Sequence, residues 1–243
     1  MRIIKDIPYG PHPQNLLDLY LPDSDKYDLV LYMHGGYLER GSKDNNTHIF
    51  TYLAQQGIAS ATIDYRMYPT AHYPDFVWDA AAAAAWLKMN QDLLEGCQRI
   101  FISGSSAGAY LSQLLCFDSR YLGELGLKNT DFAGFFHDAG QPTCHTSVLK
   151  ELELDGRRLI VDEHAPLYYV GLQEEYPPMH FVVSDDDIPG RYEQTMLMLS
   201  TLRHFGHHAT VEVRQGGHCH YVGATDEGGS VLGQMIEAFV KSV

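Results

Sequence analysis

The chain has few positive charges and no long apolar run. Of its 243 residues, 17 are Lys or Arg and 31 are Asp or Glu, so the formal net charge at pH 7 is −14. Nucleic acids and anionic membrane surfaces bind clustered Lys and Arg, and we therefore expect neither as a partner. No apolar run approaches the roughly 18 residues of a membrane span, and the N-terminus lacks an apolar core of signal-peptide length. The sequence therefore predicts a soluble, cytoplasmic protein.

Cysteine is scarce, and repeats, low-complexity tracts and linkers are absent. The four cysteines are Cys97, Cys116, Cys144 and Cys219; they are widely spaced and form no C-x-x-C pair. A chain of this length buries most of its apolar surface without cross-links. We therefore expect reduced, partly buried thiols. The length suits one α/β domain that spans residues 1–243.

Short β-rich runs alternate with helical patterns along the chain. We expect strands at 16–21, 28–33, 58–64, 99–103, 132–136, 179–184 and 209–214, and helices at 46–56, 75–94, 107–116, 190–205 and 229–240. The run at 16–21 alternates with period two, which predicts an early edge strand. Strands that alternate with crossover helices indicate an α/β fold with a mostly parallel sheet and helices on both faces. Residues 141–178 interrupt the alternation and are expected to form a short cap.

The stretch RIFISGSSAGAYLSQLL, residues 99–115, places two serines between an expected strand and an expected helix. A serine nucleophile can be presented on a sharp strand-to-helix turn, which requires very small residues two positions before and after it. Ser106 has Gly104 and Gly108 in those places, and Ser105 does not. A G-x-S-x-G sequence also recurs by chance as an ordinary turn. The strand before it and the helix after it favour a nucleophile.

A nucleophilic serine needs a base, and in this architecture the chain order is serine, acid, histidine. His218 follows the strand expected at 209–214 through a glycine-rich turn and precedes the last helix. His220 is the alternative base. The His-Cys-His triplet at 218–220 also raises a metal site, but no third ligand has suitable spacing, so we expect no metal.

The orienting acid is expected among three consecutive aspartates that end the strand expected at 179–184. Adjacent carboxylates raise one another's pKa unless some are solvated or paired, so the three are not expected to share one role. We favour Asp187, with Asp185 as the alternative. The non-catalytic interpretation is a solvated loop that caps the next helix.

Backbone donors for a developing oxyanion are expected after the strand at 28–33. His34, Gly35, Gly36 and Tyr37 follow this strand, and glycines allow N–H groups to turn toward the serine. The N–H of Ala107, at the start of a helix, would complete the oxyanion hole. An ordinary turn is the alternative. Because the motifs occur in the required order at strand ends, we predict that the serine at position 106 is a nucleophile.

These motifs resemble the α/β-hydrolase superfamily, in particular bacterial serine esterases with an HGG-type oxyanion motif, which are related to hormone-sensitive-lipase-like esterases and kynurenine formamidases. The resemblance covers nearly the whole chain and is carried by YGPHPQNLLDLYLP, HGGYLERG, ATIDYRMYP, SDDDIPGRYEQT and GGHCHYV. It implies the α/β-hydrolase fold. The register of SDDDIPGRYEQT on the family's acid loop assigns the acid to Asp187, and HGGY assigns oxyanion N–H groups to Gly36 and Tyr37.

The chain departs from the esterase motif at two positions. Tyr37 stands where the family has its third glycine, and Leu38 stands where a Trp is usual. HGGY also occurs in kynurenine formamidases. The resemblance implies structural roles for Asp64, Tyr65 and Arg66, which would brace the oxyanion loop.

The function implied is that of a serine carboxylesterase for short-chain acyl esters, including acetyl or aromatic acyl esters of sugars. Its partner would be a small-molecule ester, and it would need no metal or organic cofactor. A short cap without a long apolar lid disfavours long-chain lipids. Tyr168, Tyr169, Leu172 and Tyr176 could line a pocket wall or simply pack. An aryl formamidase and a non-catalytic receptor or scaffold are the alternative functions, and the retained triad residue types count against the last.

Overall fold

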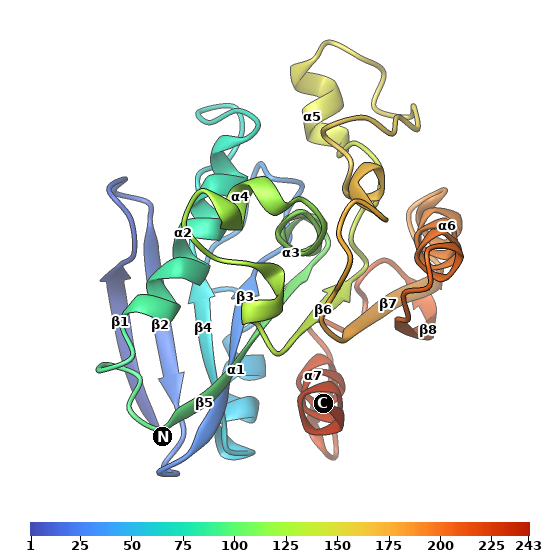
Figure 1. Ribbon diagram of the computed structural model, residues 1–243. Helices are drawn as coiled ribbons and strands as arrows, with labels where there is room; N and C mark the ends of the chain where they lie inside the picture. Colours follow the sequence, from blue (N-terminus) through green and yellow to red (C-terminus); the bar gives the residue numbers. More distant parts are fainter.

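The computed structural model describes residues 1–243 and is organised around one eight-stranded sheet (Figure 1). The strands are β1 (Arg2–Pro8), β2 (Leu16–Leu21), β3 (Tyr27–Met33), β4 (Ile58–Ile63), β5 (Cys97–Ser105), β6 (Gly134–Asp138), β7 (Met179–Asp186) and β8 (Thr210–Gly217). Their order in the sheet is β1-β2-β4-β3-β5-β6-β7-β8. Pairing is antiparallel for β1–β2 and β2–β4 and parallel for all others. The expected mostly parallel sheet is confirmed.

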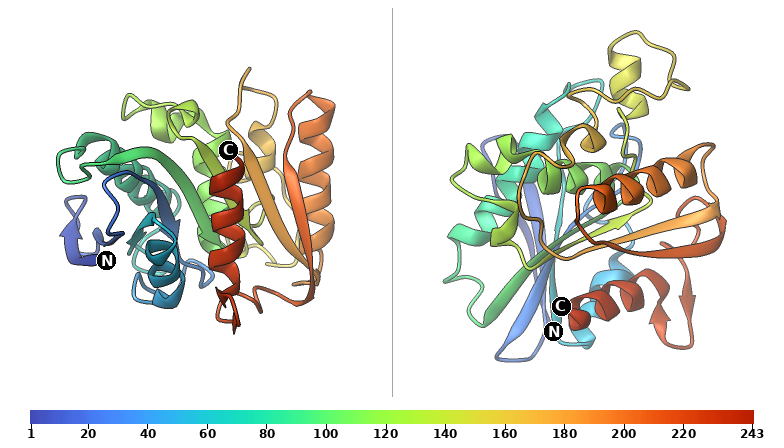
Figure 2. Two further views of the ribbon diagram at one scale, coloured as in Figure 1. Left: turned by 90° about the horizontal axis from the view of Figure 1, so that it is seen from below. Right: turned by 45° about the vertical axis from the view of Figure 1, so that its right-hand side comes forward.

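Helices cover both faces of the sheet (Figure 2). They are α1 (Thr47–Gln55), α2 (Asp75–Met89), α3 (Ala107–Phe117), α4 (Ser119–Gly123), α5 (Thr146–Glu151), α6 (Arg191–His204) and α7 (Val231–Ser242). Side chains alternate along β3 because successive residues of a strand point to opposite faces. Leu29, Leu31 and Met33 join the core under α2, α3 and α6, whereas Val30 and Tyr32 join the core under α1 and α7.

The edge strand differs from the sequence-based expectation. Leu16–Leu21 was expected at the edge, but it lies between β1 and β4, and β1 is the edge. β2 is buried on both faces, with Leu17 and Leu19 in one core and Tyr20 in the other. β1 has no buried residue, and its sequence has no clear hydrophobic pattern from which a strand could be predicted. It forms because β2 offers it a pairing edge.

Helix ends and short elements also differ. The helix expected at 75–94 ends at Met89, and Asn90 caps it with its side-chain amide on the Trp86 carbonyl at 2.8 Å. Leu94 is buried by a separate turn rather than by the helix. The short α4 and α5 and the two-residue strands β9 (Thr225–Asp226) and β10 (Gly229–Ser230) were not expected.

The segment 141–178 contains α5 and one 3₁₀ turn. Its 3₁₀ turn η2 is Pro166–Tyr169, and a further 3₁₀ turn, η1 (Asn129–Asp131), precedes the segment. Figure 1 shows α5 beyond the sheet, at the top of the view. All four cysteines are free, as expected. None of the helices is both long enough and apolar enough to cross a bilayer.

Candidate active site

Ser106 stands between β5 and α3 in a strained backbone conformation. Its φ is 53° and its ψ is −113°, which non-glycine residues rarely adopt. A Cβ at Gly104 would lie 2.4 Å from the carbonyl carbon of Gly108, and a Cβ at Gly108 would lie 2.0 Å from the carbonyl oxygen of Met33. Both positions therefore require glycine, and the sharp turn expected from the sequence is present.

His218 joins Ser106 to Asp187. The Nε2 atom of His218 lies 2.8 Å from Ser106 Oγ, and its Nδ1 atom lies 2.5 Å from Asp187 Oδ1. A carboxylate at Nδ1 favours the tautomer in which Nδ1 carries the proton, which leaves Nε2 free to accept the serine proton. The Asp187 side chain is fully buried, and that of His218 is 19% exposed. The structure thus brings together the three residues that the sequence singled out.

The Asp187 carboxylate is held ionised in spite of its burial. Burial acts to raise its pKa, but hydrogen bonding to His218, the His218 charge and the Ile188 N–H outweigh it, so the pKa lies below its ordinary value. The Ile188 N–H donates to Oδ1 at 2.7 Å, and the Ser184 N–H reaches Oδ2 at 3.3 Å. An acid in this setting can stabilise a neighbouring imidazolium.

The alternative residues lie outside this arrangement. Asp185 is exposed and accepts the Gly216 N–H at 2.8 Å, and Asp186 is exposed as well. His220 is exposed, and its Nδ1 lies 2.8 Å from the carbonyl oxygen of Gly217. Neither alternative contacts Ser106.

The loop after β3 lines the cleft that contains Ser106. Gly36 has a φ of 129°, and a Cβ there would lie 1.9 Å from the Arg40 carbonyl oxygen, so only glycine fits. Tyr37 adopts the left-handed region, with a φ of 61°, and thereby tolerates the place of a glycine. The N–H groups of Gly36 and Tyr37 donate to no backbone carbonyl. Ala107 is the first residue of α3, where N–H groups lack intrahelical partners.

His34 and Tyr65 brace this loop. Their rings stack at 4.4 Å, and the Tyr65 hydroxyl donates to the His34 carbonyl at 2.8 Å. Burial lowers the pKa of His34 to about 4, so this imidazole is neutral. A Cβ at Gly35 would lie 3.0 Å from the Ser105 carbonyl, which explains why a glycine follows the histidine.

The residues on either side of Tyr65 have different structural contacts. Asp64 accepts the N–H of Lys43 at 2.7 Å, which fixes the chain beyond the oxyanion loop. Arg66 makes a bidentate ion pair with Asp79 on α2, with its closest contact at 2.8 Å. Arg66 therefore anchors α2 rather than the oxyanion loop.

A cleft of about 340 Å³ opens above Ser106 and His218. Its walls come from the loop that contains His34 to Gly41, from Asn45 and Asn46, and from the segment that contains His218 to Val222. No residue of 141–178 lines it.

The candidate wall residues of the cap therefore lie elsewhere. Tyr169 is buried and its ring packs 5.3 Å from the Arg120 guanidinium, and Tyr176 packs 5.2 Å from Phe117. Tyr168 and Leu172 are exposed.

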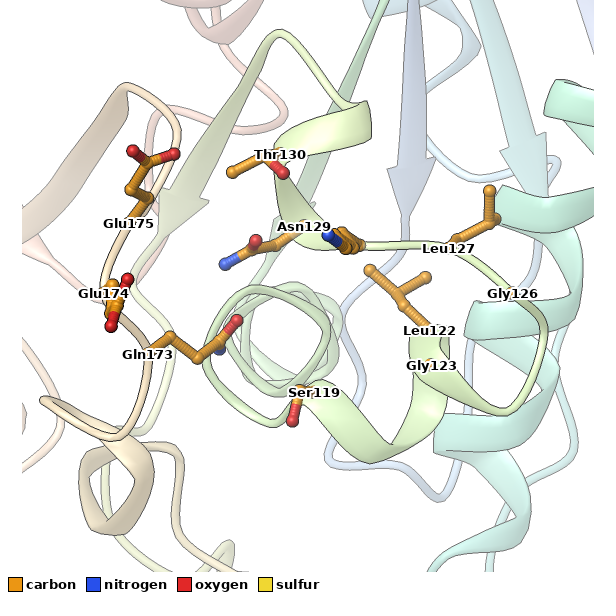
Figure 3. Close-up of a pocket in the computed structure, with 11 residues that line it drawn as sticks. Ser119, Leu122, Gly123, Gly126, Leu127, Asn129, Thr130, Gln173, Glu174 and Glu175 are labelled. Carbon is orange, nitrogen blue, oxygen red and sulfur yellow. The ribbon is translucent and has the colours of Figure 1, made fainter.

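A second cavity, of about 700 Å³, is larger but carries no triad residue. Figure 3 shows its two sides, one from residues 119–130 and the other from residues 173–175. Its lining includes the charged residues Lys128, Glu174 and Glu175. Size alone therefore does not mark the candidate site.

One group of potential metal ligands occurs, and it lies in the segment 141–178. Donor atoms of Cys144, Asp162 and His164 lie within 4.8 Å of one another. Asp162 Oδ1 accepts the backbone N–H of His164 at 2.9 Å and also contacts its Nδ1 at 3.0 Å. A local turn therefore accounts for two of the three. The residues at 218–220 form no such group.

One residue of the site was missed. Asp138, the last residue of β6, accepts the Ser106 N–H with its carbonyl oxygen at 2.7 Å and is fully buried. Its carboxylate contacts Ser105, the neighbour of Ser106. The sequence offered little signal for it: Asp138 lies two residues beyond the strand expected at 132–136, and nothing local indicates a partner that lies in another strand.

The sheet order, the serine turn between β5 and α3 and the histidine loop after β8 define the α/β-hydrolase fold. Esterase B from Lactobacillus Rhamnosis has a similar structure, with a TM-score of 0.79, 18% sequence identity, and coverage of 99% of this chain and 85% of that chain. This likeness extends over the whole sheet and its helices.

The sequence comparisons match less than half of the chain. The BD-FAE family model matches residues 17–122. A "probable isoprenylcysteine alpha-carbonyl methylesterase" of Arabidopsis thaliana is 33% identical over 120 residues, which cover 48% of this chain and 28% of that protein. A kynurenine formamidase of Danio rerio is 30% identical over 114 residues, which cover 46% and 38%. The matched part is thus less than two fifths of either relative. The chain has the α/β-hydrolase fold, and its residues 17–122 match the BD-FAE family model.

Proposed function

We propose that the protein is a serine hydrolase that cleaves carboxylic esters through Ser106, His218 and Asp187. The observation that carries this proposal is the unbroken chain of contacts from Ser106 Oγ to His218 Nε2 at 2.8 Å and from His218 Nδ1 to Asp187 at 2.5 Å. The esterases and methylesterases among similar proteins support the same reaction class.

The reaction proceeds in two acyl-transfer steps. His218 Nε2 takes the Ser106 proton as Oγ attacks the ester carbonyl carbon, and the negative oxygen is stabilised by the N–H groups of Gly36, Tyr37 and Ala107. The imidazolium then protonates the departing alcohol, which leaves an acyl-enzyme. A water molecule gives its proton to His218 and attacks the acyl carbon, and the serine regains its proton.

The size and lining of the cleft support the proposed substrate class. Its volume is about 340 Å³ and no apolar lid from 141–178 covers it, which supports small acyl groups rather than long lipid chains. Acetyl or aromatic acyl esters of sugars are members of this class. The polar side chains of Arg40, Asn45 and Asn46 in the walls suit an alcohol that carries hydroxyl groups.

The test combines substrate turnover with labelling of the serine. Wild type is expected to hydrolyse 4-nitrophenyl acetate and to react with a fluorophosphonate probe at Ser106. Ser106→Ala and His218→Ala are expected to lose turnover by at least roughly 10³-fold, because each removes a member of the triad. A folded wild-type protein that neither reacts with the probe nor hydrolyses any ester of a short acyl panel would instead support a non-catalytic scaffold.

An aryl formamidase is the second candidate, since one similar protein is a kynurenine formamidase and HGGY occupies 34–37. The same triad and oxyanion donors can cleave a formamide. Side-by-side turnover of 4-nitrophenyl acetate and N-formylkynurenine separates the two. Formamide rates far above ester rates would reverse the order of the candidates.

A further inference from the structure

We infer that Asp138 is a positioning residue of this site, which holds the nucleophile turn with its backbone and side chain and presents a second negative charge to His218. This inference rests on the proposed hydrolase function. Nothing in the serine–histidine–acid sequence pattern requires an acid at this place.

Asp138 forms hydrogen bonds with two adjacent residues of the nucleophile turn. Its carbonyl oxygen accepts the N–H of Ser106 at 2.7 Å, and its Oδ2 atom accepts the hydroxyl of Ser105 at 2.5 Å. Ser106 occupies a strained conformation that persists only where the surrounding structure holds it. The two hydrogen bonds to Asp138, on the neighbouring strand β6, help to hold Ser106 in this conformation.

The carboxylate is the centre of a buried network on the α1–α7 side of the sheet. The hydroxyl of Tyr221, in the segment that follows His218, donates to Oδ1 at 2.5 Å. The hydroxyl of Tyr32, on β3, donates to Ser105 Oγ at 2.8 Å. Asp138 therefore connects the strand that carries the serine with the loop that carries the histidine. A change at this position would alter the relative placement of both.

The charge of Asp138 is not compensated by Lys or Arg. Both oxygens accept hydrogen bonds from hydroxyl groups, and the side chain is fully buried. The charge that opposes its burial comes from His218. Cys219 Sγ contacts both groups, at 4.0 Å from Asp138 Oδ2 and 3.6 Å from His218 Nε2. A negative charge so placed stabilises an imidazolium during catalysis.

Burial raises the pKa of Asp138 to about 6, against the hydrogen bonds from Ser105 and Tyr221 and the charge of His218. The titratable groups that face it are Tyr32, Tyr221, Cys219, His218 and, farther away, Asp187. At pH 7.5 it is ionised at a cost to stability, since its folded-state pKa exceeds its ordinary value.

The first variant is Asp138→Asn, assayed with 4-nitrophenyl acetate at pH 7.5. We expect kcat to fall by about 10- to 100-fold with KM changed by less than about twofold, because the substrate cleft is untouched while the reacting groups shift. We also expect Tm to be unchanged or higher, since the amide carries no charge to bury. In wild type, proton uptake by Asp138 contributes to the acid limb of the pH–rate profile near pH 6. In the variant this contribution disappears.

A serine pair on β5 supplies a matched control. Ser105 donates to Asp138, whereas the hydroxyl of Ser103, on the same strand and equally buried, has no hydrogen-bond partner. Ser105→Ala is therefore expected to lower kcat severalfold, and Ser103→Ala is expected to retain wild-type kcat. Both variants delete one oxygen from the same strand.

The outcomes separate this inference from the function on which it rests. Wild type without ester turnover and without probe labelling would overturn the hydrolase function itself. Wild-type turnover together with a wild-type kcat in Asp138→Asn would overturn the positioning role only. A lower Tm in Asp138→Asn, with kcat per folded molecule unchanged, would show a purely structural residue.

Discussion

Neighbouring residues at this site differ sharply in their surroundings. Asp187 is buried and bonded to His218, while Asp185, two positions earlier, is exposed and bonded to a backbone N–H. Ser106 faces the imidazole, while Ser105 points to the buried Asp138. The chemistry of each side chain is thus set by the direction in which one turn of chain presents it.

The aspartate pair yields a direct prediction. Asp187→Asn is expected to lower kcat by roughly 10³- to 10⁴-fold. The amide NH₂ of Asn would donate to Nδ1 of His218, which favours the tautomer in which Nε2 carries the proton. In that tautomer Nε2 cannot accept the proton of Ser106. Asp185→Asn keeps an acceptor for the Gly216 N–H and is expected to stay within about twofold of wild type. Steady-state kinetics with 4-nitrophenyl acetate measures both. A larger loss in Asp185→Asn than in Asp187→Asn would move the acid to position 185.

α3 packs so closely against β3 at Gly108 that the position has room for a hydrogen atom but not for a methyl group. A Cβ at Gly108 would lie 2.0 Å from the Met33 carbonyl oxygen and 2.7 Å from that of His34. Because α3 follows Ser106 directly, its distance from β3 sets the position of the nucleophile relative to the oxyanion loop. The glycine therefore has both a packing role and a geometric one.

Gly108→Ala is expected to destabilise the fold by at least about 1–3 kcal/mol, as overpacking of a tight contact does. Gly123→Ala is the matched control, since Gly123 lies in α4 and a Cβ there would meet nothing within 4 Å. Alanine at that helical position is expected to be neutral or to stabilise by up to about 1 kcal/mol. Urea unfolding measures both. Equal stability of the two variants would contradict the close approach of α3 and β3.

Three buried neutral histidines make the stability of the molecule depend on pH. Burial lowers the pKa of His34 to about 4 and the pKa values of His137 and His145 to about 3. Below pH 6.5 the unfolded chain takes up a proton at each, whereas the folded protein does not. Stability is therefore complete above pH 6.5 and falls as the pH decreases toward 4, by about 1.4 kcal/mol per pH unit for each histidine.

Asp138 opposes this trend, since its folded-state pKa of about 6 lies above the ordinary 3.8. Between pH 6 and 4 it takes up a proton first in the folded state and offsets about one histidine. The net loss is expected to be about 3 kcal/mol per pH unit in that range. Urea unfolding at pH 7.5, 6 and 5 measures this slope, and His137→Gln should make it shallower. A free energy of unfolding that stays constant from pH 7.5 to 5 would contradict the neutral, buried state of these histidines.

The features that were predicted from the residues alone are local in the chain. The turn around Ser106 requires glycines two positions away on each side, and strand and helix patterns extend over consecutive residues. Short stretches of sequence therefore carry enough information to predict them. Ser106, Asp187 and His218 were predicted because each follows an expected strand and the three occur in the chain order serine, acid, histidine. Helix ends were less well predicted, as at Met89, because capping and packing compete over one or two turns.

Other features depend on segments far apart in sequence, and these required the folded chain. β1 becomes an edge strand only because β2 offers a free pairing edge. The cleft walls come from the loops after β3 and β8 rather than from the cap, because packing alone decides which loops meet. The Asp138 network joins four elements through side chains, and no local pattern encodes contacts between residues 33 to 83 positions apart.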